Sequence, residues 1–291
     1  MLYLDAVEEF LLEKSLSCRE RTVDYYRERL DYFHRATGVE HVTDIDTRTV
    51  AEYRKGIAHL SPRTVHNYLL AVKTFCGWLV RRGLLRQNPV PRLSRASRTH
   101  GKPSGLSDAQ VKACLAVAKR SRFPERNVAL LYLLLDTGIR AGELCGLNLE
   151  DIDHEGRTIR VDGKTGERVV PVSSRTLRAL RRYVASHRVA GVRERALFTT
   201  QEGVRITPNF LTTLLKRIAQ RAGIPNDVKT GPHTYRHTFA LGYIRNGGDP
   251  FSLQRILGHT TMDMVSVYLR MEGTALSEAH GKFSPLSRLA A

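Results

Sequence analysis

The chain has 291 residues, enough for one large domain or two medium ones, and its 42% hydrophobic and 26% charged residues are typical of a globular protein. Its charge is unusual, because 46 Lys and Arg against 29 Asp and Glu give a net charge of +17 and a pI near 10.1. This charge indicates a polyanionic partner, since each neutralised phosphate releases condensed counterions. The alternative is a soluble enzyme whose basic charge has no such role.

The cysteines and the N-terminus indicate the compartment. The four cysteines lie far apart and form no CxxC pair, so neither a zinc knuckle nor a dithiol redox motif is supported. The first residues, MLYLDAVEEFLLEK, are acidic and amphipathic, unlike a signal peptide, and no apolar run approaches membrane-spanning length. We therefore expect a cytoplasmic protein with reduced thiols in its core and no membrane partner.

Residues 1–97 are expected to form a small helical domain. Apolar residues recur at helical spacing in YLDAVEEFLL and again in SCRERTVDYYRERLDYFHRA. The clearest helix follows Ser61, a suitable N-cap, has Pro62 in its first turn and ends at Gly83. Its apolar stripe, which we predict to be core, consists of Val65, Tyr68, Leu69, Val72, Phe75, Cys76 and Leu79.

Charge is one-sided over the second part of this region. No Asp or Glu occurs from Tyr53 to Ser107. The basic residues in the same span are Arg54, Lys55, Arg63, Lys73, Arg81, Arg82, Arg86, Arg92, Arg95, Arg98 and Lys102. A solvated face normally mixes both signs, so this run favours a surface that lies against a phosphate backbone over a merely solvent-exposed one.

A linker and a larger domain follow. NPVPRLSRASRTHGKPSG (88–105) is typical of an extended linker, placed at 98–106, and a second domain is expected over 107–291, with Ser107 as its first helix cap. NVALLYLLLDTGIRAGELCGL is apolar enough to be central to that domain's core. RTIRVDGKTGERVVPVS predicts a hairpin around a Gly-Lys-Thr-Gly turn, and helical patterns return afterwards. The expected fold is mainly α with a small antiparallel sheet.

The stretch PHTYRH (232–237) permits two kinds of site. Two histidines four apart suit zinc, but a metalloprotease needs a glutamate as general base where Thr234 stands. His233 and Arg236, three apart, share a helix face and suit a phosphate instead. A nucleotide-binding P-loop at GKT is also disfavoured, because Thr158 replaces its first glycine and the segment is a hairpin. The phosphate interpretation is therefore preferred.

Other charged residues fit the same interpretation. In TGIRAGEL, Arg140 and Glu143 are three apart, and a carboxylate can hold a guanidinium in place while that guanidinium binds phosphate oxygens. Lys164 stands at the predicted hairpin tip, an exposed position. Each of these residues alone is a weak signal, because a lone arginine or lysine is usually a surface residue.

The last motif is LGHTTMDMVSVY, which contains His259 and Tyr268. On one continuous helix, residues nine apart would lie on opposite sides. Thr260 with Asp263 resembles a capping box, which would start a new helix just after His259. A break before Tyr268 would then let both side chains converge.

In chain order the set is Arg140, Lys164, His233, Arg236, His259 and Tyr268. This set closely resembles the active site of the tyrosine recombinases, the phage integrase family. The stretches that carry the resemblance are LLLDTGIRAGEL, GKTGERVVPV, HTYRHTFA and LGHTTMDMVSVY. LSPRTVHNYLLAVKTFCGWLVRRGLLRQNPV also resembles the family's core-binding domain, and the compact size is most similar to the Xer-type enzymes. Tyr235 departs from the family's usual leucine and is expected to be buried.

The resemblance implies a fold and a reaction. Residues 1–97 would be a SAM-like, DNA-binding core-binding domain, and the rest a catalytic domain. Tyr268 would attack a phosphodiester of double-stranded DNA, leaving a 3′-phosphotyrosine and a free 5′-hydroxyl. Lys164 would protonate the leaving 5′-oxygen, and His233 would act as acid or base near the tyrosine or the phosphate.

The resemblance also assigns the remaining charged residues. Arg140 and Arg236 would bind the non-bridging oxygens of the phosphate, with His259 as a further donor. Glu143 would support the arginine rather than take part in the chemistry. With these cations present, no metal or nucleotide cofactor is required.

Partners and alternatives complete the expectations. A homotetramer would act on a specific recombination site, alone or with a second recombinase. Its C-terminal tail would dock on a neighbour or on its own chain through Leu276, Ala279, Phe283 and Leu286. The target sequence is left open, as is the choice among chromosome dimer resolution, plasmid resolution, and integration and excision of a mobile element. A type IB topoisomerase and a non-catalytic DNA-binding accessory protein are the alternatives.

Overall fold

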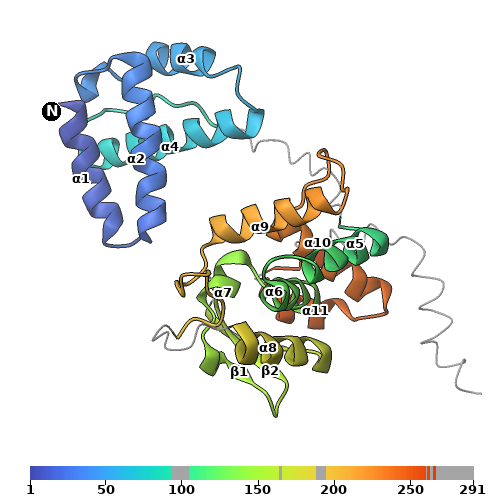
Figure 1. Ribbon diagram of the computed structural model, residues 1–291. Helices are drawn as coiled ribbons and strands as arrows, with labels where there is room; N and C mark the ends of the chain where they lie inside the picture. The colour runs from blue at the N-terminus through green and yellow to red at the C-terminus, as the bar shows by residue number, and fades with distance from the viewer. Residues whose placement is uncertain (94–104, 164–165, 188–194, 260, 263–264, 267–291) are drawn as a thin grey trace, which may run out of the picture. The chain divides into compact units, whose positions relative to one another are not determined.

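The computed structural model describes residues 1–93, 105–163, 166–187, 195–259, 261–262 and 265–266. The chain divides into two compact units, Met1–Thr99 and His100–Ala291 (Figure 1). The fold is mainly helical with one small antiparallel sheet, which confirms the predicted fold class. Within the described part of the chain, no helix is both long and apolar enough to cross a membrane.

The first unit is a set of helices around an aromatic core. Its elements are α1 (Tyr3–Ser15), α2 (Glu20–Thr37), a 3-10 turn (Val42–Asp44), α3 (Thr47–Gly56) and α4 (Pro62–Arg81). Ser61 caps α4 as predicted, since its hydroxyl accepts the backbone N–H of Thr64 at 3.2 Å. The predicted stripe of α4 is buried or half-buried, and Phe10, Phe75 and Trp78 pack edge-to-face or stacked against one another.

The second unit carries the remaining elements. Its helices are α5 (Asp108–Lys119), α6 (Pro124–Thr137), α7 (Ala141–Gly146), a 3-10 turn (Leu149–Asp151), α8 (Ser174–His187), α9 (Pro208–Arg221), α10 (Pro232–Arg245) and α11 (Pro250–Leu257). Ser107 caps α5 in a capping box with Gln110, as predicted. Leu106, at the end of the expected linker, is buried in the core of this unit, and its backbone N–H binds the Thr238 hydroxyl.

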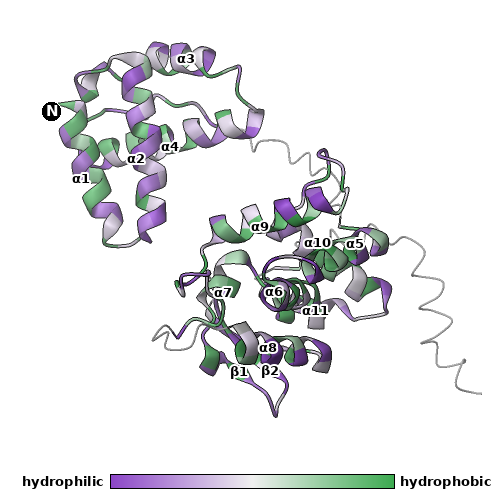
Figure 2. Ribbon diagram, in the orientation of Figure 1, coloured by the Kyte–Doolittle hydropathy of each residue, from purple (hydrophilic) through white to green (hydrophobic). Residues whose placement is uncertain are grey.

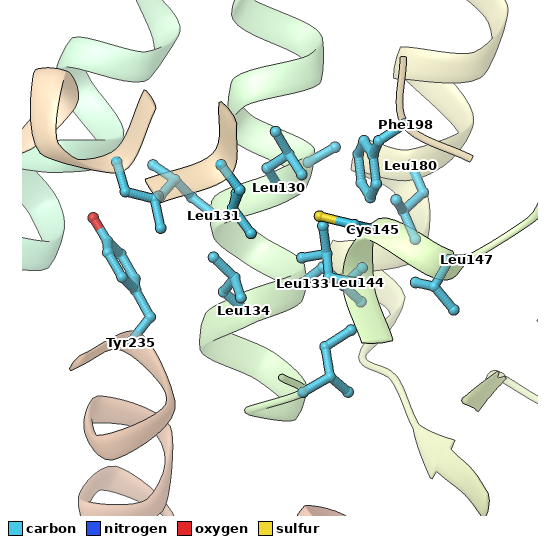
Figure 3. Packing of buried hydrophobic residues seen from close by; sticks show 14 of the residues in the cluster. Leu130, Leu131, Leu133, Leu134, Leu144, Cys145, Leu147, Leu180, Phe198 and Tyr235 are labelled. Atoms are coloured by element: carbon cyan, nitrogen blue, oxygen red, sulfur yellow. The ribbon is translucent and has the colours of Figure 1, made fainter. Parts of the chain in front are cut away.

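Helix α6 lies at the centre of this unit, in contact with α5, α8 and α10. Leu130, Leu131, Leu133 and Leu134 are all fully buried, as the apolar stretch predicted (Figure 3). In Figure 2 the colours of α6 are mostly hydrophobic, whereas α8 carries many hydrophilic residues. Tyr235 of α10 is buried in the same core, which confirms the expectation for the residue that departs from the family pattern.

The sheet has three antiparallel strands in the order β1 (Ile152–Asp153), β2 (Thr158–Gly163) and β3 (Gly166–Pro171). Gly163 pairs with Gly166, so only two residues connect β2 to β3, and the predicted hairpin is confirmed. Those two residues, Lys164 and Thr165, lie outside the described residues. Strand β1 was not predicted, because two residues are too short to show the alternation of a strand.

Candidate active site

The turn after α6 leads directly to Arg140, the first of the predicted site residues. Gly138 has a φ of +60°, and a Cβ atom there would lie 2.5 Å from the Phe239 side chain and 2.8 Å from the Leu257 side chain, so glycine suits both the turn and the close packing of α10 and α11. The turn places Arg140 at the N-cap of α7. Glu143, three residues on, accepts the backbone N–H of Arg140 at 2.8 Å, and this local contact sets the start of the helix.

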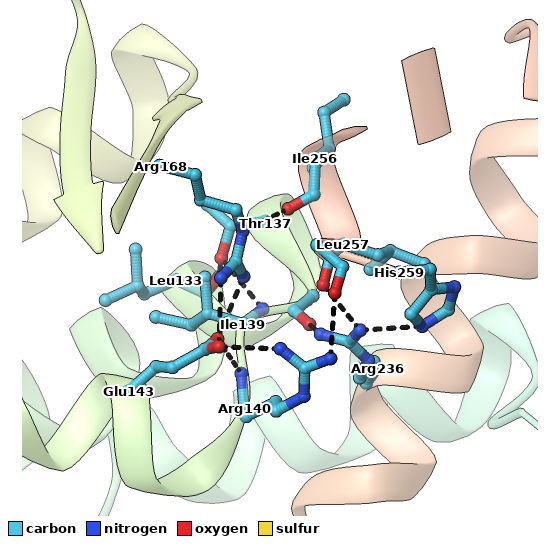
Figure 4. A network of polar contacts seen from close by, with 12 residues as sticks. Leu133, Thr137, Ile139, Arg140, Glu143, Arg168, Arg236, Ile256, Leu257 and His259 are labelled. Carbon is cyan, nitrogen blue, oxygen red and sulfur yellow. Dashed lines mark hydrogen bonds and ion pairs between the residues drawn. The ribbon is translucent and has the colours of Figure 1, made fainter. Parts of the chain in front are cut away.

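Three arginines bind three consecutive carbonyl oxygens at the end of α11 (Figure 4). The pairs are Arg168 Nε with Ile256 at 2.9 Å, Arg236 Nη2 with Leu257 at 2.7 Å, and Arg140 Nη2 with Gly258 at 3.0 Å. The last carbonyls of a helix have no partner within it and carry partial negative charge. The end of α11 therefore gathers arginines from three elements far apart in the sequence.

Arg236 is the most enclosed of the predicted phosphate ligands, with 5% of its surface exposed. Its Nη1 donates to the Gly138 carbonyl at 2.6 Å, so the arginine also joins the end of α6 to α11. Its Nη2 lies 2.8 Å from Nε2 of His259. Because a guanidinium only donates, Nε2 of His259 accepts, and the ring proton belongs on Nδ1.

His259 is held in its neutral form. Burial, followed by the charges of Arg236, Arg140 and Arg168, lowers the pKa of His259 to about 4. Nδ1 of this ring is buried and has no hydrogen-bond partner among the described residues. The ring therefore has one donor, Nδ1, that no described residue uses.

Glu143 connects two of the arginines. Oε1 accepts from Nη1 of Arg140 at 2.7 Å and from Nη1 of Arg168 at 2.9 Å, and Oε2 accepts from Nη2 of Arg168 at 2.9 Å. Burial favours the neutral acid, but hydrogen bonds from Arg168 and Arg140 outweigh it and lower the pKa of Glu143 to about 2. The carboxylate is therefore ionised and holds Arg140 in place, as predicted.

The cluster is suited to an anion. Arg140 and Arg168 carry two positive charges against the single negative charge of Glu143. The side chain of Arg140 is 30% exposed, whereas that of Glu143 is 3% exposed, so a ligand from solvent meets the arginine and not the carboxylate. A tetrahedral anion such as a phosphate group matches donors arranged in this way.

Comparison with known proteins identifies the family. Residues 105–273 match the Phage integrase family. This chain belongs to the phage integrase family, the tyrosine recombinases. These enzymes cut and rejoin DNA through a tyrosine nucleophile, and site-specific recombination is accordingly the activity of this chain. The comparisons favour neither the topoisomerase nor the accessory-protein alternative.

Curated relatives and solved structures agree with this assignment. The tyrosine recombinase XerC of Oceanobacillus iheyensis is 31% identical over 98% of this chain and 96% of its own length. XerC of Thermodesulfovibrio yellowstonii is 32% identical over 78% of each chain. The crystal structure of XerA recombinase is 26% identical, with a TM-score of 0.55 over 97% of this chain and 98% of its own. XerH bound to a palindromic difH substrate shares the fold, with 22% identity and a TM-score of 0.74 over 94% of this chain and 83% of its own.

The structure brings three of the six predicted recombinase site residues together, namely Arg140, Arg236 and His259. Lys164 and Tyr268 lie outside the described residues. The residue before the lysine is described, and a Cβ atom on Gly163 would lie 2.5 Å from Oε1 of Glu143. The strand that leads to the lysine therefore ends against the carboxylate of the arginine cluster. Thr260 and Asp263, which form the predicted capping box, also lie outside the described residues.

His233 differs from the other described site residues in its exposure. It lies in the first turn of α10, one turn before Arg236, with its side chain at the surface. It lines a hollow between α9 and the start of α10, together with Lys216 and Lys229, and the described lining contains no Asp or Glu. This hollow is therefore suited to further phosphates beside the cluster. His237 is half-buried, and burial, His233 and Arg236 lower its pKa.

Arg168 is the member of the recombinase cluster that the sequence did not predict. It contacts Glu143 through both terminal nitrogens and α11 through Nε. Arg160, on the neighbouring strand, instead pairs with Asp151 near the surface. Both arginines occur in the same stretch of alternating residues. One signal was available. Val161, the direct partner of Arg168, is predicted by the alternation of β2 to face the core, so Arg168 should lie on that same face of the sheet.

Proposed function

We propose that this recombinase cuts double-stranded DNA at a specific site with Tyr268 as nucleophile. Arg140, Arg236 and His259 hold the scissile phosphate. The observation that carries the proposal is the arginine cluster at the end of α11. It gathers Arg140, Arg236 and His259 there, and Nδ1 of His259 has no partner among the described residues. A phosphodiester placed there meets preorganised donors in a largely buried setting.

The reaction is a transesterification. The phenolic oxygen of Tyr268 attacks the phosphorus, and its proton passes to His233 or to water. The bond from phosphorus to the 5′-oxygen breaks as Lys164 gives that oxygen a proton. Arg140 and Arg236 stabilise the added charge of the pentacoordinate transition state. The 5′-hydroxyl of another strand then reverses the chemistry, so the energy of the phosphodiester is conserved and no external energy source is needed.

The phenol requires help at neutral pH, because its ordinary pKa is about 10. Positive charge around the phosphate favours the phenolate form that develops during attack. This demand is consistent with the cationic cluster, whereas His259 stays neutral because it is buried beside the same arginines. A neutral imidazole donates from Nδ1 without adding a further buried charge.

DNA and three further copies of the chain are the proposed partners. The net charge of +17, the basic run before residue 107 and the basic hollow beside His233 all suit a phosphate backbone. The solved XerH relative is bound to difH substrate, and the Tn1549 transposon integrase, with a TM-score of 0.79 and 22% identity, is bound to transposon end DNA. We propose a cytoplasmic homotetramer that acts on two duplexes.

Covalent trapping tests this function. Wild-type protein incubated with sheared genomic DNA from its host should form SDS-resistant adducts, and sequencing of the trapped fragments should reveal one preferred site. Tyr268→Phe should bind the recovered site and form no adduct. Tyr235→Phe is the matched control, because that tyrosine is buried in the core and should leave adduct formation intact. Adducts formed by Tyr268→Phe would refute the assignment.

The same assay tests the absence of a metal requirement. Adduct yield should be unchanged by EDTA, since the cations that stabilise the transition state are side chains. A loss of adducts in EDTA that zinc or magnesium restores would show that a metal ion takes part.

A further inference from the structure

Arg168 lies on β3, four residues after the hairpin lysine, and joins that strand to two other parts of the site. Its three guanidinium nitrogens each donate at 2.9 Å, Nε to the Ile256 carbonyl and Nη1 and Nη2 to the two oxygens of Glu143. The side chain is 12% exposed. One planar group thus fixes β3 to both α7 and α11 (Figure 4).

Two glycines enclose this guanidinium. Gly258 has a φ of +62°, and a Cβ atom there would lie 3.0 Å from Cζ of Arg168. Gly163, at the end of β2, would place a Cβ atom 3.3 Å from Nη1 of Arg168. Because these backbones approach so closely, Arg168 has little freedom to change position.

The hairpin above Arg168 is short. Two residues connect Gly163 to Gly166, and Arg168 is itself paired with Val161 of β2. The described ends of these two strands are therefore held against Glu143 and α11. A shift of about 1 Å in the position of a reacting group is enough to slow a reaction by about a hundredfold.

We propose that Arg168 is a positioning residue that fixes the β2–β3 hairpin, and with it Lys164, at a set distance from the phosphate-binding arginines. This inference rests on the proposed role of Lys164 as general acid. Removal of Arg168 leaves Glu143 bound to the Nη1 and the backbone N–H of Arg140. Arg140 therefore keeps its contacts with Glu143 for binding the phosphate. The step that becomes slower is proton transfer to the leaving group.

The test compares two DNA substrates that differ in one atom, a 5′-bridging oxygen or a 5′-bridging sulfur at the cleavage site. A thiolate leaves without a proton, since thiols are far more acidic than alcohols. In single-turnover cleavage, Arg168→Lys and Arg168→Ala should slow the oxygen substrate by about tenfold or more and the sulfur substrate by less than about threefold. Arg168→Lys keeps the charge but cannot make three coplanar contacts.

Three variants serve as references. Lys164→Ala should show the same preference for sulfur, and Arg140→Lys should slow both substrates alike. Arg160→Ala is the matched control from the neighbouring strand, because its guanidinium is half-exposed and pairs with Asp151, and it should change neither rate. Cleavage of the sulfur substrate also reports that each variant is folded.

The outcomes distinguish a failure of the positioning role of Arg168 from a failure of the proposed acid role of Lys164. If Lys164→Ala slows both substrates equally, the acid role of the lysine fails and the inference fails with it. If Lys164→Ala favours sulfur while both Arg168 variants slow the two substrates equally, or cleave neither, Arg168 is structural and only the inference is overturned. The double variant Lys164→Ala/Arg168→Ala should cleave the oxygen substrate no more slowly than Lys164→Ala alone, and a multiplied loss would contradict the proposal.

Discussion

At the residue scale, His259 shows how the surroundings of a side chain set its protonation and link the site to stability. Its folded-state pKa of about 4 lies below its ordinary value of 6.5, because burial and three arginines disfavour the charged ring. The unfolded chain therefore binds a proton more readily than the folded one. The stability that His259 contributes is complete above pH 6.5 and is lost as the pH falls from there through about 4.

The first prediction follows from this linkage. Between pH 7 and pH 5 the free energy of unfolding should fall by up to about 2 kcal/mol on account of His259 alone. His259→Gln retains an acceptor for Arg236 but has no titration in this range, so its free energy of unfolding should depend less on pH. Urea unfolding of both proteins at the two pH values measures the difference. Parallel curves would mean that His259 is not held neutral.

Glu143 leads to a second prediction at this scale. Glu143→Gln removes a buried charge on which Arg140 and Arg168 both depend, and losing one partner of a buried pair costs about 3 kcal/mol. The melting temperature and the cleavage rate should both fall. Glu150→Gln is the matched control, because its ion pair with Arg195 lies at the surface with 46% of the Glu150 side chain exposed. Equal effects of the two substitutions would contradict the role assigned to Glu143.

At the element scale, local signals predicted most of what the structure shows. Ser61 and Ser107 identified helix starts, and the Gly-Lys-Thr-Gly turn identified the hairpin, because caps and turns depend on residues close in sequence. Arg140 with Glu143 could be paired for the same reason. The anchoring of the arginines on α11 could not be predicted, because backbone carbonyls leave no mark in a sequence and Arg168 meets Ile256 across 88 residues.

A third prediction concerns the turn that ends α11. Gly258→Ala places a side chain at positive φ and against Arg168, so it should lower both the melting temperature and the cleavage rate. Gly223→Ala is the matched control, because Gly223 has a φ of +71° with nothing within 4 Å of the added atom. That variant should lose about 1 kcal/mol of stability and keep its cleavage rate. Normal cleavage by a folded Gly258→Ala variant would show that the close packing against Arg168 is dispensable.

At the scale of the whole molecule, charge determines how the recombinase meets its substrate. The excess of 46 basic over 29 acidic residues attracts DNA without regard to sequence, and the affinity it supplies depends on salt. Site preference must come from contacts with base edges, which charge alone does not provide. The hollow beside His233 is suited to contacts that do not depend on DNA sequence, because its lysines are exposed and can bind phosphates.

The fourth prediction tests that hollow. Lys216→Ala and Lys229→Ala should each weaken binding to all DNA sequences and reduce the slope of log affinity against log salt by about 1. Fluorescence anisotropy over a series of salt concentrations measures this slope. Arg160→Ala should leave it unchanged, since Asp151 already balances that charge. An unchanged slope for both lysine variants would place the DNA backbone elsewhere.

The end of α11 has a consequence for how this enzyme can vary over generations. The oxygens that seat Arg168, Arg236 and Arg140 belong to the main chain at residues 256–258. No substitution deletes a main-chain carbonyl, so the three acceptors persist as long as the chain keeps this path, although the Leu257 side chain is itself fully buried in the core. The three arginines cannot be replaced in the same way, because their side chains supply the donors, and Gly258 is needed for the turn at positive φ. The acceptors of this site are therefore set by the backbone conformation at residues 256–258, whereas its donors are set by three particular side chains.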